Sequence, residues 1–532
     1  MAKLASQRAV SKIYCLVRAS DRRVARKRVL QSLRDRLVLH TLSAASQLKI
    51  VAIPSDLSDE HLGLATEEYA EISKNLTHVL HFAWSVNFNK TLESFEKDCI
   101  AGAKNLMTLC LRAQRPKSAT FSFCSSVSTT VRTPDTAVPE SLPQSLACAQ
   151  GMGYAQSKLV TEHLCDRASQ HGLHARVLRV GQIIGDSQHG VWNNSEAIPM
   201  IFQTAKTISA LPKLDESPLW LPVDLVADSC IEISSSAAPS GVYNIVNHNS
   251  FHWTRDLLPL LRSAGLEFDE LDQREWIQRL KASNPDPVSN PPIKLIDFFA
   301  NKYDNEKPRR SLRYDNSISQ DYSPSLQNAG LVDAALMQKI VSQLSRNWSI
   351  SNTRQEPTAI FLCGPCGSGK TSAAQAMSSK YSVPIIEGDD IHSLSAKAAM
   401  RNGTALTDAE RLVWLSHIRG AVVDRFASSQ SPAVLVTCSA LKTSYRDELR
   451  KLHDIANIHT VFIMLSTTDG DDLRQRLSLR KDHYMGSSMV ASQLDILEAP
   501  RDHEIDTVIV DANQGMIDML TDVEDVIDII LS

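Results

Sequence analysis

Eight consecutive residues at the start of the last third of the chain have the types and spacing of a phosphate-binding loop. Residues 364–371 read GPCGSGKT and fit the pattern G-x-x-x-x-G-K-[ST] in full. Glycines in such a loop let backbone N–H groups point at phosphates, and the following helix start adds favourable potential. We expect Lys370 to neutralise the phosphates and Thr371 to hold Mg²⁺. The predicted nucleotide-binding residues are Gly364, Gly367, Ser368, Gly369, Lys370 and Thr371.

The segments on both sides of this loop have the character that the loop requires. An apolar run at 359–363 predicts a strand, and the alanine-rich segment 372–379 predicts a helix. Cys363 and Cys366 also form a C-x-x-C pair, which in other contexts is a redox motif. Because the demands of the phosphate loop already account for these positions, we interpret the two cysteines as part of the loop.

Two adjacent carboxylates follow the next predicted strand. Asp389 and Asp390 come after the apolar run 383–386, and the carboxyl ends of parallel strands are where ligands bind. We expect Asp389 to act as a Mg²⁺ ligand and either aspartate to act as base for a substrate hydroxyl. A helix-capping pair is the alternative. Further along, Arg476 and Arg480 are predicted to close over the phosphates and stabilise the transferring charge.

A second constellation lies in the first half of the chain. Tyr154 and Lys158 are four residues apart, so on a helix they share a face. Lys158 is then expected to lower the pKa of the phenol from about 10, which would let Tyr154 donate a proton to a carbonyl group. Ser126 ends the preceding apolar run and could hydrogen-bond the same carbonyl. This pattern is typical of carbonyl reduction by a nicotinamide cofactor.

Three further residues stand where predicted strands end, and we assign them to cofactor binding. They are Arg18, Asp56 and Asn87. An arginine at the first of these positions suits a ribose 2′-phosphate, which favours NADP over NAD.

Short apolar runs alternate with longer amphipathic segments in two blocks. This alternation predicts an α/β fold with parallel sheets covered on both faces. We predict two fused domains, a Rossmann-like domain over 1–350 and a phosphate-loop domain over 357–532, with 301–357 as a tail and linker. The predicted strands are 12–17, 48–53, 78–82, 120–123 and 176–184 in the first block, and 359–363, 383–386, 433–437, 459–465 and 507–510 in the second.

Composition excludes several classes of protein. The 532 residues include 56 Lys and Arg against 60 Asp and Glu, so a dedicated nucleic-acid binder is not expected. The apolar runs of the sequence are all shorter than a membrane-spanning helix requires. The ten cysteines are scattered through a long chain, which favours reduced thiols and a cytoplasmic location.

The C-terminal block resembles the gluconokinase family of carbohydrate kinases. The shared stretches include GPCGSGKT, EGDDIH, LTD with the following R and WL, CSALK, YRD and R-x-x-x-R-x-x-H-Y-M. The resemblance implies a kinase fold like that of nucleoside-monophosphate kinases and transfer of phosphate from MgATP to the 6-hydroxyl of D-gluconate. His392, Lys442, Arg446 and His483 are then the candidates for binding the sugar acid. Ala396 and Ala399 depart from the Asn and Lys that the family usually has there.

The first block resembles the thioester-reductase domain of fungal enzymes related to non-ribosomal peptide synthetases and carboxylic acid reductases, which is an extended short-chain dehydrogenase. The shared stretches include KIYCLVRA, RVGQIIGD, LWLPVD, SNPDP and PIKLIDFF. The resemblance implies NADPH as cofactor and a carrier protein as partner. The family begins with a strand and a glycine-rich turn, T-G-x-x-G-F-x-G, but the first glycine of this chain is Gly63. We expect this difference to weaken cofactor binding by about 10²- to 10⁶-fold and to leave a gap in the sheet beside 12–17.

The leading prediction is therefore ATP-dependent gluconate phosphorylation, with an impaired reductase-like domain. The alternative is an active NADPH-dependent thioester reductase fused to the kinase, which an upstream glycine-rich turn would support. A first block that serves only as a scaffold, and two genes merged into one, are further alternatives. A homodimer is one candidate state.

Overall fold

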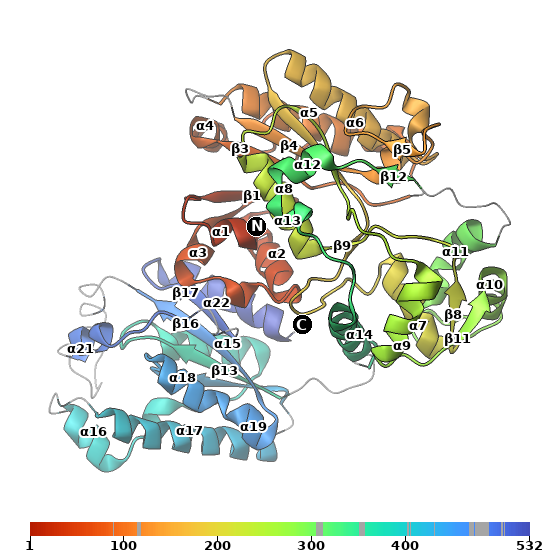
Figure 1. The fold of residues 1–532 in the computed structure, drawn as a ribbon. Coiled ribbons are helices and arrows are strands. Elements are labelled where there is room, and N and C mark those ends of the chain that lie inside the picture. The colour runs from red at the N-terminus through yellow and green to blue at the C-terminus, as the bar shows by residue number, and fades with distance from the viewer. Residues whose placement is uncertain are drawn as a thin grey trace. The chain divides into compact units, whose positions relative to one another are not determined.

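The computed structural model describes the whole chain except residues 89, 114–118, 305–311, 350–356, 402–403, 405, 430, 468–472, 474–488, 502–503, 505 and 532. Its contacts divide it into two compact units. Unit 1 comprises 1–54 together with 354–532, and unit 2 comprises 55–353. These units differ from the predicted division at 350–357, because the segment 1–54 packs with the C-terminal block (Figure 1).

Unit 1 is built on a five-stranded parallel sheet in the order β14-β15-β13-β16-β17. The phosphate-loop strand β13 occupies the centre of this sheet, so the loop emerges at the middle of its carboxyl edge. The strands are β13 Thr358–Cys363, β14 Ile385–Glu387, β15 Ala433–Thr437, β16 His459–Ser466 and β17 Thr507–Asp511, and the helices are α15 Lys370–Tyr381, α16 Leu394–Arg401, α17 Asp408–Ser428, α18 Thr443–Arg450, α19 Leu452–Ala456, α21 Met489–Asp495 and α22 Met516–Leu531.

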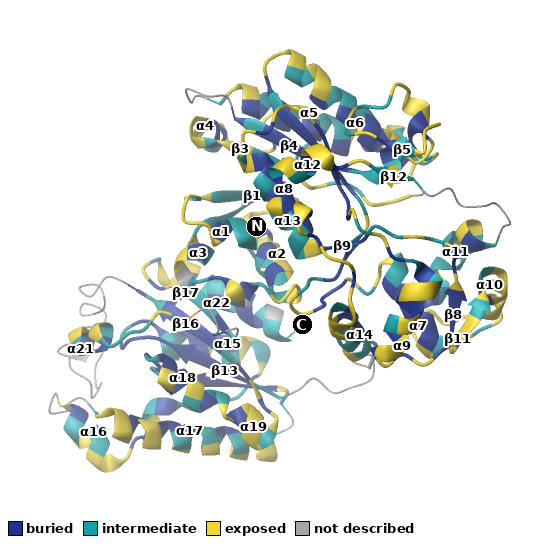
Figure 2. Ribbon diagram, in the orientation of Figure 1, coloured by how far each residue is buried: buried dark blue, intermediate teal, exposed yellow. Residues whose placement is uncertain are grey.

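Helices cover both faces of this sheet, and the strands between them are buried (Figure 2). On one face, α17 and α18 contribute Trp414, Ile418 and Leu449 to a core with β13 and β15. On the other, α15 and α22 pack through residues such as Met377 and Val523. Near-continuous apolar strands are what a doubly covered parallel sheet requires.

The N-terminal segment of unit 1, residues 1–54, forms a separate two-stranded parallel sheet. Strand β1 (Ile13–Val17) pairs with β2 (Ile50–Pro54). Helix α2 (Arg22–Asp35) connects them and is N-capped by the Asp21 carboxylate, which accepts a hydrogen bond from the Val24 N–H. Short helices α1 (Ala2–Ala5) and α3 (Ala44–Leu48) complete the segment.

Unit 2 contains a four-stranded parallel sheet in the order β10-β6-β4-β3 and three small two-stranded pairings. Helix α6, which carries the predicted Tyr and Lys, packs against β4 and β6. The strands are β3 His78–His81, β4 Thr120–Ser126, β5 Ala137–Val138, β6 His174–Val180, β7 Ile183–Ile184, β8 Ala210–Lys213, β9 Leu221–Pro222, β10 Gly241–Ile245, β11 Asp269–Asp272 and β12 Arg313–Tyr314. The helices are α4 Thr66–Asn75, α5 Ala101–Leu111, α6 Gly153–Gln170, α7 Ala197–Thr207, α8 Val223–Ser235, α9 Leu258–Ser263, α10 Gln273–Lys281, α11 Ile296–Tyr303, α12 Ser317–Tyr322, α13 Pro324–Gln327 and α14 Ala334–Ser349.

The predicted α/β class and parallel sheets are confirmed. Each predicted strand has a counterpart within a few residues, although 176–184 is divided into β6 and β7. The predicted tail and linker over 301–357 is more ordered than expected. Helix α14 lies inside it and buries Met337, Ile340 and Leu344 in the core of unit 2.

The strands of the first block belong to separate sheets. Among the described strands, β1 pairs with β2 alone, and β3 is an end strand of its own four-stranded sheet. The predicted gap beside 12–17 stays a prediction.

Candidate functional site

The phosphate loop of unit 1 connects β13 to α15, and its glycines have backbone conformations that other residues rarely adopt. Gly364, Gly367 and Gly369 have φ values of 135°, 84° and 99°. A Cβ on Gly364 would lie 2.6 Å from the Leu465 carbonyl oxygen of the neighbouring strand β16. Glycine is therefore required both for the turn and for the close approach to β16.

Lys370 is the first residue of α15, and its side chain folds back over the loop. Its Nζ donates hydrogen bonds to the carbonyl oxygens of Gly364 (2.9 Å) and Pro365 (2.8 Å). The ammonium group is thus held at the mouth of the loop beside the N-terminus of a twelve-residue helix. Both features favour an anion at this position.

A cavity opens next to the loop and brings together several of the predicted residues. Lys370 and Thr371 line it from α15, and Asp389 and His392 line it from the segment after β14. In this segment, position 388 requires glycine, because a Cβ there would lie only 2.2 Å from the Thr437 carbonyl oxygen. The complete lining is Cys366, Gly367, Gly369, Lys370, Thr371, Glu387, Asp389, His392, Met400, Leu406, Arg411, Trp414, Ser439 and Gln493.

The His392 imidazole is stacked on the Trp414 indole, with ring centroids 4.2 Å apart and planes at 11°. Burial lowers the pKa of His392 to about 4, so the ring is neutral at physiological pH. Its Nδ1 is buried without a hydrogen-bond partner among the described residues. A neutral imidazole with a free nitrogen can hydrogen-bond a hydroxyl group of a ligand.

Sequence reasoning did not assign three further lining residues to the site. Arg411 is 8 % exposed and donates from Nε to the Leu406 carbonyl oxygen. Glu387 accepts a hydrogen bond from the Thr437 hydroxyl, and the Gln493 side chain accepts one from the Cys366 N–H at 2.7 Å. All three lie within or beside motif stretches of the C-terminal block, so their positions could have identified them.

Two of the predicted residues have other partners and do not line the cavity. Asp390 is exposed, and its carbonyl oxygen accepts a hydrogen bond from Lys397 Nζ at 3.2 Å. Lys442 Nζ forms an ion pair with Asp408 at 2.8 Å. Arg476, Arg480 and His483 lie outside the described residues, so their roles stay predictions.

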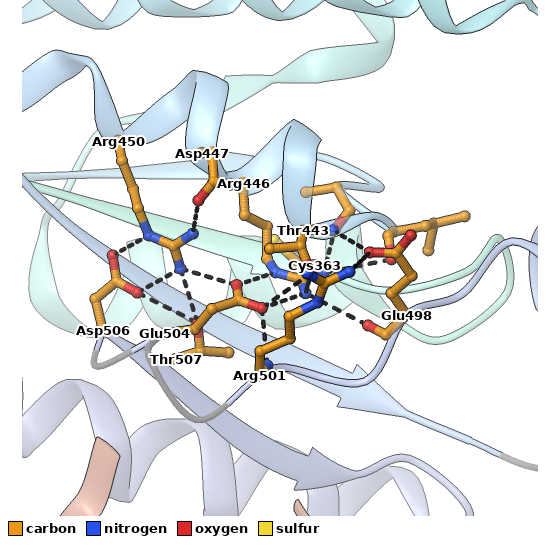
Figure 3. A network of polar contacts seen from close by, with 12 residues as sticks. Cys363, Thr443, Arg446, Asp447, Arg450, Glu498, Arg501, Glu504, Asp506 and Thr507 are labelled. Atoms are coloured by element: carbon orange, nitrogen blue, oxygen red, sulfur yellow. Dashed lines mark hydrogen bonds and ion pairs between the residues drawn. The ribbon is translucent and has the colours of Figure 1, made fainter. Parts of the chain in front are cut away.

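Arg446, which Figure 3 shows with its polar partners, is fully buried and also does not line the cavity. It forms a two-pronged ion pair with Glu504, with Nε–Oε2 and Nη2–Oε1 distances of 2.5 and 2.7 Å. Although burial acts to raise the pKa of Glu504, hydrogen bonds from Arg446 and Arg450 and from the Arg501 N–H lower it to about 2. The pair fixes α18 to the segment before β17.

The two cysteines of the C-x-x-C pair are both buried. Burial raises the pKa of the Cys363 thiol to about 12. A reactive cysteine needs a lowered pKa and access to solvent. The interpretation of these residues as structural parts of the loop agrees with this environment.

The donor groups of the cavity fit a hydrated Mg²⁺ ion. Thr371 offers a hydroxyl, and Asp389 and Glu387 offer carboxylates, all lining one cavity. Mg²⁺ prefers one or two such oxygen ligands together with substrate phosphates and waters. The Ser368 hydroxyl is fully buried and has no partner among the described residues, so the loop also retains a free hydrogen-bonding group.

Unit 2 brings the three predicted catalytic residues together. Tyr154 and Lys158 are on α6, and Ser126 ends β4, where its side chain hydrogen-bonds the Tyr154 phenol. Gly153 lets the backbone at Lys90 approach the start of α6, since a Cβ there would lie 2.4 Å from the Lys90 carbonyl oxygen. The Phe88 ring meets the Tyr154 ring edge-on at 5.3 Å.

The prediction that Lys158 lowers the pKa of the Tyr154 phenol is wrong in this structure. Burial, with the nearby Cys124 thiol, raises the pKa of Tyr154 to about 12 instead of lowering it. Lys158 is 3 % exposed, and its Nζ donates to the Cys124 carbonyl oxygen at 2.6 Å. Burial lowers the pKa of Lys158 to about 8. The ammonium also lies 4.4 Å from the centre of the Trp84 ring, closer than the 5.8 Å to the Tyr154 ring.

The three predicted cofactor residues are divided between the units. Arg18 follows β1 in unit 1, whereas Asp56 and Asn87 belong to unit 2. Asp56 accepts hydrogen bonds from the Ser58 N–H and hydroxyl group. The chain offers no glycine before Gly63, so the residues present do not complete a cradle for a dinucleotide pyrophosphate.

Comparisons with known proteins find relatives of the N-terminal part of the chain. Residues 1–230 match the family model described as male sterility protein. A 3-methylorcinaldehyde synthase from Talaromyces stipitatus is 30 % identical over 361 residues, which are 64 % of this chain and 13 % of that protein. An adenylate-forming reductase from Stachybotrys bisbyi is 28 % identical over 301 residues, or 55 % of this chain and 28 % of that protein. The chain thus spans a minor part of these relatives.

Two solved structures resemble different parts of the chain. The terminal R domain from the myxalamid PKS-NRPS pathway covers 65 % of this chain and 87 % of its own, with a TM-score of 0.56 and 22 % identity. That likeness shows the fold. A gluconokinase from Sinorhizobium meliloti is 34 % identical over 34 % of this chain and 94 % of its own, with a TM-score of 0.28.

The N-terminal part therefore resembles the male sterility protein family over residues 1–230 and has the α/β fold of the R domain. The predicted resemblance to thioester-reductase domains is confirmed for this part. The comparisons support the reductase alternative more strongly than gluconokinase activity. Among the described residues, no helix has the length and apolar character needed to cross a bilayer.

Proposed function

We propose that the chain combines two activities, a reductase-like unit that takes carrier-bound acyl groups and a phosphate-loop kinase that phosphorylates D-gluconate. The observation that supports the kinase most directly is the cavity in which Lys370, Thr371 and Asp389 meet beside a complete phosphate loop. The family match over 1–230 supports the reductase-like part.

In the proposed kinase reaction, ATP binds with its phosphates in the loop. Lys370 and the loop N–H groups stabilise the negative charge of the transferred group. Thr371 and Asp389 are the residues that would hold Mg²⁺, which when bound would offset the negative charge of the phosphates. Glu387 and Asp389 are the carboxylates available in the cavity to orient and deprotonate the acceptor hydroxyl.

Arg411 is our candidate for recognising the carboxylate of the sugar acid. It is the arginine that lines the cavity among the described residues, and its planar guanidinium suits a carboxylate. His392 can then hydrogen-bond a hydroxyl group of the same ligand. Arg446 and Lys442 keep supporting roles in this proposal, since each is paired with a carboxylate outside the cavity.

A coupled ADP-release assay over a panel of sugar acids tests the kinase proposal. We expect the purified full chain to turn over D-gluconate and Lys370→Ala to lose activity. Lys451→Ala is the matched control, because Lys451 is an exposed lysine that does not line the cavity. Turnover of shikimate or adenylylsulfate but not gluconate would contradict the assignment of the substrate.

For unit 2 we propose binding of an acyl thioester presented by a carrier protein. The relatives named as an aldehyde synthase and an adenylate-forming reductase favour this substrate class. Ser126 and the Tyr154 phenol lie together, so both can hydrogen-bond the thioester carbonyl oxygen, and the raised pKa keeps the phenol protonated as a donor. NADPH is the cofactor that the family favours.

A titration with NADPH tests this part. Because the chain offers no glycine-rich cradle before Gly63, we expect dissociation constants in the millimolar range. Micromolar binding would show that the proposed loss of the cradle is wrong and would support full reductase activity.

A further inference from the structure

Two oppositely charged helices face each other within unit 1, although one lies near the start of the sequence and the other at its end. Helix α2 carries Arg23, Arg26 and Lys27, which we call the basic face of α2. Helix α22 carries Asp522, Glu524, Asp525 and Asp528, which we call the acidic face of α22. Figure 1 shows the two helices side by side.

The two faces are joined by specific ion pairs. Arg23 Nε lies 2.7 Å from Asp525 Oδ1, and Lys27 Nζ lies 2.7 Å from Asp528 Oδ2. Arg23 also pairs with Glu524, and Arg26 pairs with Asp522. The side chain of Asp525 is only 2 % exposed. A buried carboxylate requires a partner, which Arg23 provides.

Apolar contacts reinforce this interface. Residues 1–54 form a small core around Ala5, Val29, Leu33 and Leu42, and Val508 of β17 packs against it. The segment therefore contacts both α22 and the last strand of the kinase sheet. A segment of this size buries little apolar surface by itself, so these contacts add burial to it.

Helix α22 also reaches the phosphate loop. Its Met519 side chain lies 3.1 Å from the position that a Cβ on Gly369 would occupy. On the same helix, Glu524 pairs with Lys380 at 2.6 Å and Asp528 accepts a hydrogen bond from the Tyr381 hydroxyl, both at the end of α15. One helix thus connects α2 to the loop and to the helix that follows it.

The composition of the two helices explains why they need each other. The sequence of α22, MIDMLTDVEDVIDIIL, contains five acidic residues and no lysine or arginine. Like charges at helical spacing are destabilising. The six basic residues of α2 offset that repulsion.

We propose that residues 1–54 are an accessory element of the kinase unit, in which the basic face of α2 holds α22 in place against the phosphate loop. Only one part of this inference, the expected change in ATP affinity, rests on the proposed nucleotide binding. Its structural part, that α2 stabilises α22, is independent of any ligand.

Charge reversal in the full chain tests the proposal. The variant Arg23→Glu with Lys27→Glu should increase hydrogen exchange in α22, lower Tm by about 4 °C and raise the Kd for ATP about threefold or more. Combining it with Asp525→Arg and Asp528→Lys should restore protection of α22, because the pairs reform with exchanged signs. Arg8→Glu with Arg36→Glu makes the same change in net charge at two exposed positions and should leave α22 protected.

The readouts separate the inference from the proposed function. Unchanged exchange in α22 after reversal of Arg23 and Lys27 would overturn the inference, whatever the ATP affinity. The inference would also be overturned if the variant with all four substitutions did not restore the protection of α22 from hydrogen exchange. The same holds if Arg8→Glu with Arg36→Glu reduced that protection as much as the reversal of Arg23 and Lys27. A wild-type chain that protects α22 but ignores ATP would instead contradict the kinase proposal.

Discussion

At the scale of single residues, the two sites differ in how their charged groups are satisfied. Lys370 and Arg411 line one cavity, and each donates to backbone carbonyl oxygens beside it. Lys158, by contrast, is deeply buried among aromatic rings and donates to a backbone carbonyl. The first arrangement is the one that we propose binds a phosphorylated or acidic ligand, whereas the second places a cation in an apolar environment.

Arg411→Ala tests the proposed recognition of the sugar acid. Loss of a charge-assisted hydrogen bond worth about 1.5–3 kcal/mol should raise KM for gluconate by about 10- to 150-fold. KM for ATP should stay within about twofold of the wild-type value, because the phosphate loop connects β13 to α15 whereas Arg411 is on α17. Steady-state kinetics with each substrate varied in turn give both values. Equal increases in the two KM values would indicate a general structural defect instead.

Lys158→Met tests the buried ammonium through the pH dependence of stability. The pKa of Lys158 is lowered from 10.5 to about 8 in the folded state. Between these values the unfolded chain binds a proton that the folded chain does not, so this group makes stability rise with pH from 8 to 10.5. Across that window, the free energy of unfolding of the wild type should rise by about 2–3 kcal/mol relative to that of Lys158→Met.

Urea unfolding followed by tryptophan fluorescence at pH 7, 8.5 and 10 measures this difference, with Trp84 as a nearby reporter. A difference between the two proteins that does not change with pH would show that Lys158 titrates normally.

The residue types at the phosphate loop could be assigned from the sequence because the loop is local. Eight consecutive positions contain the glycines, the lysine and the threonine that it needs. Arg446 shows the limit of that reasoning. Its motif predicts a ligand contact, but its partner Glu504 is 58 residues away and comes from a different part of the fold. The pKa of Tyr154 could not be predicted either, since it depends on burial.

At the scale of elements, strands were predictable and their partners were not. Apolar runs bounded by polar residues indicate strands such as β13 and β15, because both faces of the sheet are covered. The pairing of α2 with α22 depends on side chains from opposite ends of the sequence, which no local pattern connects. Helix α14 was missed because its apolar face completes a core formed by other elements.

Glu504→Gln tests the element-scale role of the buried ion pair between α18 and the segment before β17. Removal of one partner should destabilise the kinase unit by about 3–5 kcal/mol at pH 7, because Arg446 stays buried and unpaired. Since the pKa of Glu504 is lowered to about 2, its stabilisation is present above about pH 4.5 and is lost as pH falls toward 2.

The difference in stability between wild type and Glu504→Gln should therefore shrink as pH falls from about 4.5 toward 2. Thermal unfolding from pH 2 to 7 can follow this change. Glu448→Gln is a control. Glu448 is also on α18, but it pairs with Arg419 of α17, and both of these side chains are 15 % exposed. A pH-independent difference would contradict the lowered pKa.

At the scale of the whole molecule, the compact units cross the boundary that the sequence motifs suggest. The motifs separate the two blocks at about residue 350, whereas the contacts assign 1–54 to the unit that contains the phosphate loop. The physical reason lies in contacts between distant parts of the sequence. The basic face of α2 pairs with the acidic face of α22, and Val508 of β17 packs against the small core of 1–54.

Parallel titrations of the full chain with MgATP and with NADPH test the central claim most directly. That claim is that unit 1 has a complete cradle for a nucleotide phosphate, whereas the chain as given has none for a dinucleotide. We expect MgATP to bind with a Kd of about 1 μM to 1 mM and to bind about 100-fold more weakly to Lys370→Ala. NADPH should bind more weakly than MgATP and with the same affinity to both proteins. Tight NADPH binding by a chain that does not respond to MgATP would contradict the account.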